Sequence, residues 1–177
     1  MSNNYRKYRQ KPEKKSRNKK IDPALNNSGW SVLKAWKEIP PKGKYALYEY
    51  PTKSGPVDYA LVVDGNVIGL VEAKKENEEI YGVLTQAKRY ARDLEKPSFD
   101  FGEFKVPFIY STNGKTFYFQ DLRKEDSRSK KVLTFHIPEA LIENLEKDLT
   151  KAPLWLVDNP IKESYMSNKE KNSYSLR

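Results

Sequence analysis

The sequence contains no cysteine, and this absence excludes disulfide bridges and thiolate metal sites. A chain of 177 residues is long enough to bury a hydrophobic core without such cross-links. No apolar run reaches the length of a membrane-spanning helix, and the N-terminus lacks the apolar stretch of a signal peptide. We therefore expect a soluble, cytoplasmic protein with no membrane association.

The scarcity of histidine and the lack of a phosphate-binding loop limit the reactions that the chain could catalyse. The only histidine, His136, falls in a predicted strand, where a structural role is favoured over that of a general base. No Gly-x-x-x-x-Gly-Lys-Ser/Thr motif, which would cradle the phosphates of ATP, occurs in the chain. The chain by itself is therefore expected to have no ATP site.

Positive charge is concentrated at the N-terminus. The formal net charge is +9, and residues 1–20 hold nine lysines or arginines against a single acid, Glu13, so the remainder is close to neutral. A basic arm over residues 1–20, with Tyr5 and Tyr8 interleaved, fits contact with a nucleic-acid backbone through counterion release. A solvated tail explains the same composition equally well.

Hydrophobic periodicity predicts a mixed α/β domain over residues 21–150, followed by a polar extension over residues 151–177. Strands are predicted at residues 45–50, 57–63, 67–73, 107–111, 115–120 and 132–136. Helices are predicted at residues 21–27, 78–94 and 138–149, and a loop at 123–131. Asp64-Gly65-Asn66 and Asn113-Gly114 are turn signals that predict two hairpins.

The stretch GLVEAKK, residues 69–75, ends an apolar strand with closely spaced charges. Side chains alternate along a strand, so Glu72 and Lys74 share one face. Asp58 begins the strand over residues 57–63, and antiparallel pairing about the predicted turn brings it to the same end as Glu72. Two adjacent carboxylates repel each other, and Mg²⁺ would relieve the conflict, while Lys74 could neutralise a phosphate. A strand that simply exits into solvent explains these charges equally well.

Further motifs flank this stretch in a fixed order between about residues 13 and 120. They are Glu13, Ser16-Arg17, Ile21-Asp22, Gly29-Trp30, Val57-Asp58-Tyr59, Glu72-Ala73-Lys74, Gln86-x-x-x-Tyr90 and Thr112-Asn113-Gly114. Together they resemble the PD-(D/E)xK nucleases, specifically the N-terminal endonuclease domain of type I restriction enzyme restriction (R) subunits. The resemblance implies a restriction-endonuclease-like α/β fold, with a mixed central sheet flanked by helices.

The resemblance also implies a role for each matching residue. Asp58 and Glu72 match metal ligands, joined by the backbone carbonyl of Ala73 and by the carboxylate of Glu13. Lys74 matches the catalytic lysine, and the helix motif adds two further catalytic positions, Gln86 and Tyr90. The implied cofactor is Mg²⁺, for which Mn²⁺ can substitute. Without the resemblance, Gln86 would be interpreted as an ordinary surface amide and Tyr90 as an aromatic residue of the core.

The function implied by the resemblance is Mg²⁺-dependent hydrolysis of phosphodiester bonds in double-stranded DNA, as part of a type I restriction-modification system. Members of the family continue into an ATP-dependent helicase motor, so the implied partners are that motor in the same longer polypeptide and separate modification and specificity subunits. The alternative is a DNA-binding or assembly module that keeps the fold but does not cleave. An RNA-associated basic protein is a third hypothesis, supported only by the arm and the tyrosines.

Overall fold

The computed structural model describes residues 17–74, 83–124 and 127–147. The chain divides into two units, Met1–Lys147 and Asp148–Arg177, and all described residues belong to the first. Most of the predicted basic arm and the whole predicted extension over residues 151–177 therefore lie outside the described residues.

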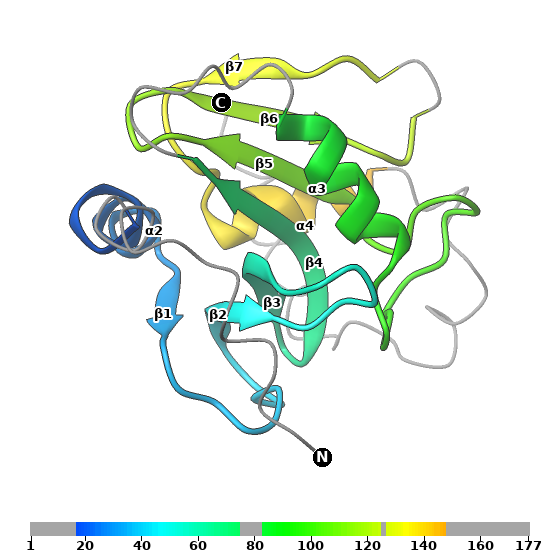
Figure 1. Ribbon diagram of the computed structural model, residues 1–177, viewed down its shortest axis with the longest axis horizontal. Helices are drawn as coiled ribbons and strands as arrows, with labels where there is room; N and C mark the ends of the chain where they lie inside the picture. Colours follow the sequence, from blue (N-terminus) through cyan, green and yellow to red (C-terminus); the bar gives the residue numbers. More distant parts are fainter. Residues whose placement is uncertain (1–16, 75–82, 125–126, 148–177) are drawn as a thin grey trace, which may run out of the picture. The chain divides into compact units, whose positions relative to one another are not determined.

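A mixed sheet of seven strands, in the order β1-β2-β3-β4-β5-β6-β7, organises the described part of the chain (Figure 1). The strands β1 and β2 are parallel, as are β4 and β5, and the other neighbours are antiparallel. The structure thus confirms the predicted mixed α/β class. The bounds are β1 Ser31–Leu33, β2 Lys44–Tyr50, β3 Val57–Val63, β4 Asn66–Ala73, β5 Phe108–Thr112, β6 Phe117–Asp121 and β7 Lys130–Val132.

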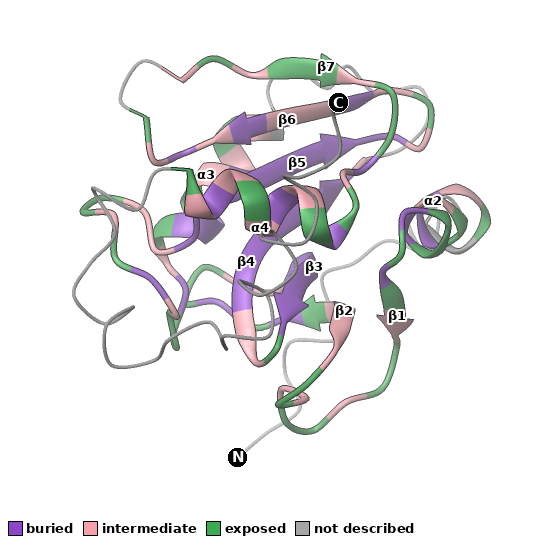
Figure 2. Cartoon of the chain, turned by 180° about the vertical axis from the view of Figure 1, so that it is seen from behind, coloured by how far each residue is buried: buried purple, intermediate pink, exposed green. Residues whose placement is uncertain are grey.

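The hairpin of β3 and β4 forms the middle of this sheet and confirms the predicted turn. Asp64 and Gly65 link the two strands, and both have positive φ, at 46° and 82°. Positive φ at both central residues is the type I′ geometry that matches the natural twist of a two-residue hairpin. Every residue of β3 is buried, as are all residues of β4 after its first, so both faces of the hairpin are covered (Figure 2).

One helix covers the first face of the sheet. Helix α3, Val83–Arg92, packs against β4 and β5, and its Ala87 and Ala91 share an apolar cluster with Leu70 and Ile109 (Figure 1). Since Leu70 and Ile109 are neighbours in register, this cluster defines the α3 face of both strands.

No helix in the described ranges is long and apolar enough to span a membrane.

The opposite face is covered by the other helices and by aromatic residues. A π-helical turn, η2 Arg17–Ile21, leads into α2, Asp22–Asn27, whose Asp22 accepts a hydrogen bond of 2.7 Å from the hydroxyl of Tyr59 on β3. Helix α4, Pro138–Glu146, begins two residues after His136. The carbonyl of His136 accepts a hydrogen bond of 2.9 Å from the indole of Trp30. Residues 21–27 were predicted as a helix, and α2 confirms this.

The predicted strand over residues 132–136 is wrong. The edge strand β7 ends at Val132, and most of it lies within the predicted loop over residues 123–131. Leu133 is 98% exposed, whereas Phe135 is buried and packs edge-on against Phe117 at a centroid distance of 5.0 Å. By leaving the sheet edge, the chain buries the ring of Phe135 against Phe117, which stabilises this path through removal of apolar surface from water. The short strand β1 was not predicted at all.

The helix predicted over residues 78–94 ends earlier than expected. Helix α3 stops at Arg92, because the carbonyl of Asp93 accepts from Lys53 N at 2.9 Å and Leu94 pairs with Thr52 in an isolated bridge. Residues 78–82 lie outside the described residues. The helix predicted at 138–149 is confirmed as α4 up to Glu146.

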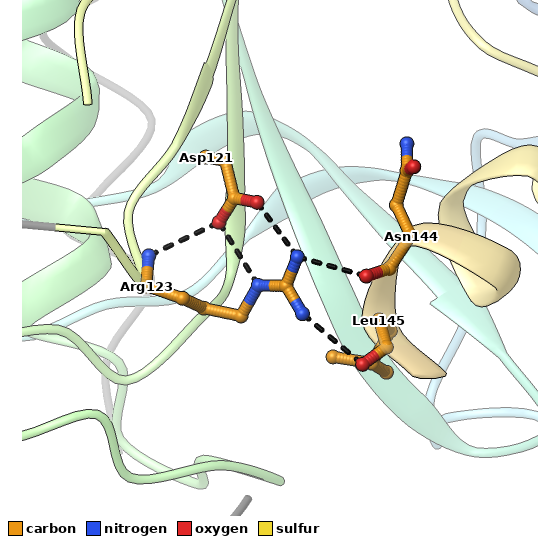
Figure 3. Close-up of polar contacts among 4 residues, drawn as sticks. All are labelled: Asp121, Arg123, Asn144 and Leu145. Carbon is orange, nitrogen blue, oxygen red and sulfur yellow. Dashed lines mark hydrogen bonds and ion pairs between the residues drawn. The ribbon is translucent and has the colours of Figure 1, made fainter. Parts of the chain in front are cut away.

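Arg123 fastens the end of α4 to the sheet (Figure 3). Its guanidinium donates to both carboxylate oxygens of Asp121, at 2.9 and 2.6 Å, and to the carbonyls of Asn144 and Leu145, at 2.9 and 3.1 Å. These carbonyls belong to the last turn of α4 and have no acceptor role within the helix. A cation at this position also complements the helix dipole, so the buried guanidinium serves as a C-terminal cap supplied from another element.

Replacing Arg123 by alanine should lower the free energy of unfolding by about 3 kcal/mol, because Asp121 and two helix carbonyls lose their shared donor. Arg123→Lys should recover only part of this, since an ammonium lacks the planar fork. Urea denaturation of the 177-residue chain measures both. Arg92→Ala is the control: it removes an exposed pair with Glu103 and should cost less than about 1 kcal/mol. Equal losses in the two alanine variants would contradict the capping role.

His136 links the stability of the fold to pH. Burial lowers the pKa of His136 below its ordinary value, and the hydroxyl of Tyr110 lies 2.6 Å from its Nδ1, which fits a neutral imidazole accepting at that nitrogen. A depressed pKa means that the unfolded chain binds the proton more readily. The contribution of neutral His136 to the free energy of unfolding is therefore complete above the pKa of the unfolded chain, near 6.5, and is lost as the pH falls below that value.

The free energy of unfolding should thus decrease between pH 7.5 and pH 5.5, and His136→Gln should flatten that decrease. The chain suits the measurement because it contains a single histidine. A decrease of the same size in His136→Gln would assign the pH dependence to other groups.

Candidate functional site

Three polar residues lie side by side on the α3 face of the sheet. Glu72 on β4 is the register partner of Ser111 on β5, and Tyr59 of β3 is the partner of Val71. One step further along the same antiparallel register, Asp58 falls opposite Glu72. We call Asp58 and Glu72 the carboxylate pair; each is only 3% exposed, so two acids are held together within the protein interior.

The backbone of β4 orients Asp58. The amide of Ala73 donates to Asp58 Oδ2 at 2.7 Å, so the carboxylate is anchored beside the peptide that follows Glu72. The next amide, that of Lys74, donates to the carbonyl of Thr112 at 2.8 Å and extends the pairing of β4 with β5. The end of β4 that carries Glu72 is therefore held by hydrogen bonds to both neighbouring strands.

A hydrogen-bonded relay holds Lys74 against helix α3. The ammonium of Lys74 donates to Gln86 Oε1 at 2.8 Å, and Gln86 Nε2 donates to the hydroxyl of Tyr90 at 3.0 Å. This orientation of the amide gives the ammonium an acceptor, whereas the reverse would place two donors in contact. The ammonium also lies 3.8 Å from Glu72 Oε1, so the relay places its positive charge beside the carboxylate pair.

Helix α3 contributes both to the apolar core and to the hydrogen bonds that hold Lys74. Tyr90 is buried and belongs to the apolar cluster with Ala87 and Ala91, while its hydroxyl reaches the relay. Gln86 and Tyr90 are four residues apart and so lie on the same side of the helix. The sequence-predicted positions Asp58, Glu72, Lys74, Gln86 and Tyr90 are thus brought together on one face, with Ala73 between two of them.

The carboxylate pair suits a hard divalent cation. Mg²⁺ prefers oxygen ligands and is commonly held by one or two carboxylates together with water and substrate phosphate. Asp58 and Glu72 provide two such carboxylates, and the repulsion between them favours a bound cation. Among the residues that the structure describes, no group of three or more histidine, cysteine or acidic side chains is arranged to hold a metal ion. Glu13, the further predicted ligand, lies outside those residues.

Ser111 is a site residue that sequence reasoning missed. It ends a predicted strand, two positions after Ile109, and alternation alone places both on one face. The missing information is the register between β4 and β5, strands joined by a long crossover, which no local turn determines.

Taken together, the site and the sheet define a mixed α/β domain with a buried carboxylate pair and an anchored lysine at the end of a central hairpin. The chain belongs to the family described as the second domain of the type I restriction enzyme EcoKI endonuclease subunit, whose model matches residues 33–145. All described site residues lie within the matched region. The predicted membership of the type I restriction endonuclease subunits is thereby confirmed.

A curated relative agrees with the family match. The type I restriction enzyme EcoKI endonuclease subunit of Escherichia coli (strain K12) is 27% identical over 190 residues, covering 79% of this chain and 16% of that protein. The chain therefore spans less than a fifth of the length of this relative. No solved structure matches the chain significantly.

A double-mutant cycle would measure how strongly Gln86 holds Lys74. We expect Lys74→Met and Gln86→Leu to show a coupling energy of about 1 kcal/mol in chemical denaturation, because the hydrogen bond has a charged donor in a half-buried setting. Lys88→Met combined with Gln86→Leu is the control, since residues two apart on a helix do not face each other. Coupling of similar size in both cycles would show that the relay does not hold Lys74.

Proposed function

We propose that this chain is the DNA-cleaving part of a type I restriction enzyme, with a PD-(D/E)xK fold, and that it hydrolyses phosphodiester bonds with Mg²⁺. The observation that carries the proposal is the buried carboxylate pair with Lys74 anchored beside it. Burying two carboxylates beside a half-buried ammonium costs stability, and such a cost is typical of functional sites; metal-assisted hydrolysis would use all three groups.

Asp58 and Glu72, together with the backbone carbonyl of Ala73, would hold the Mg²⁺ ion. When bound, Mg²⁺ supplies Lewis acidity toward the phosphodiester and neutralises its negative charge. The hydrogen bond from the Ala73 amide keeps the Asp58 carboxylate in a fixed orientation, so little rearrangement is needed on binding.

Lys74 acts on the phosphate and on the attacking water. Its ammonium can donate hydrogen bonds to the water and to a phosphate oxygen, which orients the first and stabilises charge that develops on the second. Gln86 and Tyr90 restrict the ammonium to this position through the relay, and the adjacent Glu72 offsets its charge before substrate arrives. The two relay residues therefore position Lys74 rather than react themselves.

The partners follow from the same proposal. The substrate is double-stranded DNA, and the basic arm over residues 1–20 adds sequence-independent phosphate contacts. Selection of the target sequence and ATP-driven movement would come from specificity and modification subunits and from a helicase motor in the same polypeptide. The relative's name describes an endonuclease subunit of a type I enzyme, which is consistent with this division of labour.

Asp58→Asn, Glu72→Gln and Lys74→Met should each reduce Mg²⁺-dependent nicking of supercoiled plasmid at least about 100-fold, because each removes a charge that acts on the transition state. Nicking is measured with the chain alone and within the longer subunit that carries it, together with DNA affinity. Affinity should change little, since phosphate contacts elsewhere supply most of it.

The matched controls are Glu103→Gln and Lys105→Met, which alter the same residue types at exposed ion pairs away from the site. Both should cleave like the unaltered protein. Nicking that survives all three site substitutions would refute the catalytic assignment. DNA binding without Mg²⁺-dependent cleavage in any assembly would instead favour a non-cleaving binding or assembly module.

A further inference from the structure

The hydroxyl of Ser111 has an unusual environment. Ser111 is completely buried, and its Oγ makes no hydrogen bond to any described part of the protein. Its side chain lies on the same face as Glu72, its register partner on the neighbouring strand. A polar atom is therefore buried directly beside the carboxylate pair without a partner in the fold that surrounds it.

Buried hydroxyls are nearly always hydrogen-bonded, and one without a partner costs about 1–3 kcal/mol. The adjacent Thr112 shows the usual outcome: its Oγ1 donates to the carbonyl of Thr116 at 2.8 Å and accepts from Gly114 N at 3.0 Å. Thr112 points to the other face, so the same strand satisfies one hydroxyl internally and leaves the next one unsatisfied at the site. An apolar residue at position 111 would avoid this cost, which indicates that the hydroxyl serves a bound group.

We propose that Ser111 is a positioning residue for the cation site, and that its hydroxyl hydrogen-bonds to the hydration water of a divalent cation held by Asp58 and Glu72. The inference rests on the proposed function. Divalent cations such as Mg²⁺ keep several of their waters in protein sites, and those waters are strong donors that need acceptors. A serine one strand away from a carboxylate ligand is suitably placed to accept from such a water.

The first test separates this role from a structural one. In the absence of divalent cations, Ser111→Ala should leave the free energy of unfolding unchanged or increase it, because it removes an unsatisfied hydroxyl. The control is Thr112→Val, a hydroxyl deletion at the adjacent residue, which should lower stability by disrupting two hydrogen bonds. A loss in Ser111→Ala as large as in Thr112→Val would overturn the inference, since it would show that the fold itself satisfies the hydroxyl.

The second test measures Mn²⁺ affinity directly, by electron paramagnetic resonance of free Mn²⁺ titrated with the 177-residue chain. Ser111→Ala should weaken binding about 10-fold, as is typical when a group that supports the ligands is removed. Thr112→Val should bind like the unaltered chain, despite its lower stability. The opposite effects of two neighbouring substitutions on stability and on affinity identify a positioning role.

Glu72→Gln distinguishes failure of this inference from failure of the proposed function. If the unaltered chain binds Mn²⁺, Glu72→Gln loses it and Ser111→Ala binds normally, the cation site stands and the role of Ser111 is refuted. If the unaltered chain does not bind Mn²⁺, or Glu72→Gln binds equally well, the cation site itself is refuted and the role of Ser111 with it.

Discussion

The antiparallel pairing of β3 with β4 is the constraint on which the rest of this protein depends. The type I′ turn at Asp64 and Gly65 sets only the pairing next to it. A register shift between Leu61 and Val62 then brings Asp58 opposite Glu72. A slip of β4 by one residue would move Glu72 to the other face, away from Asp58 and from α3. Because both faces of the hairpin are buried, such a slip would also exchange the side chains that pack on the two faces, so core packing and site geometry depend on the same pairing.

Much of this arrangement could be predicted from local sequence. The two hairpins follow from turn residues between alternating apolar segments, and α3 follows from apolar residues at helical spacing. The first hairpin alone places Asp58 and Glu72 at the same end of the sheet, whereas their direct opposition depends on a register shift that the turn residues do not predict. The position of Lys74 follows in turn from alternation along β4.

Features that depend on contacts between distant segments could not be predicted. Arg123 resembles any charged loop residue until the end of α4 is placed beside it. A strand was predicted over residues 132–136, but β7 ends at Val132 and the chain turns away so that Phe135 packs against Phe117. Ser111 gained its significance only from a parallel pairing with β4, whose register is set by tertiary packing.

The hydrogen bond between Lys74 and Gln86 has a consequence for how this family can diversify. It joins Lys74, the first residue after β4, to Gln86 near the start of α3, and so links the two elements directly. Changes in the length or composition of the connection between β4 and α3 therefore need not displace the lysine, because the helix is held to the strand end independently of the chain that links them.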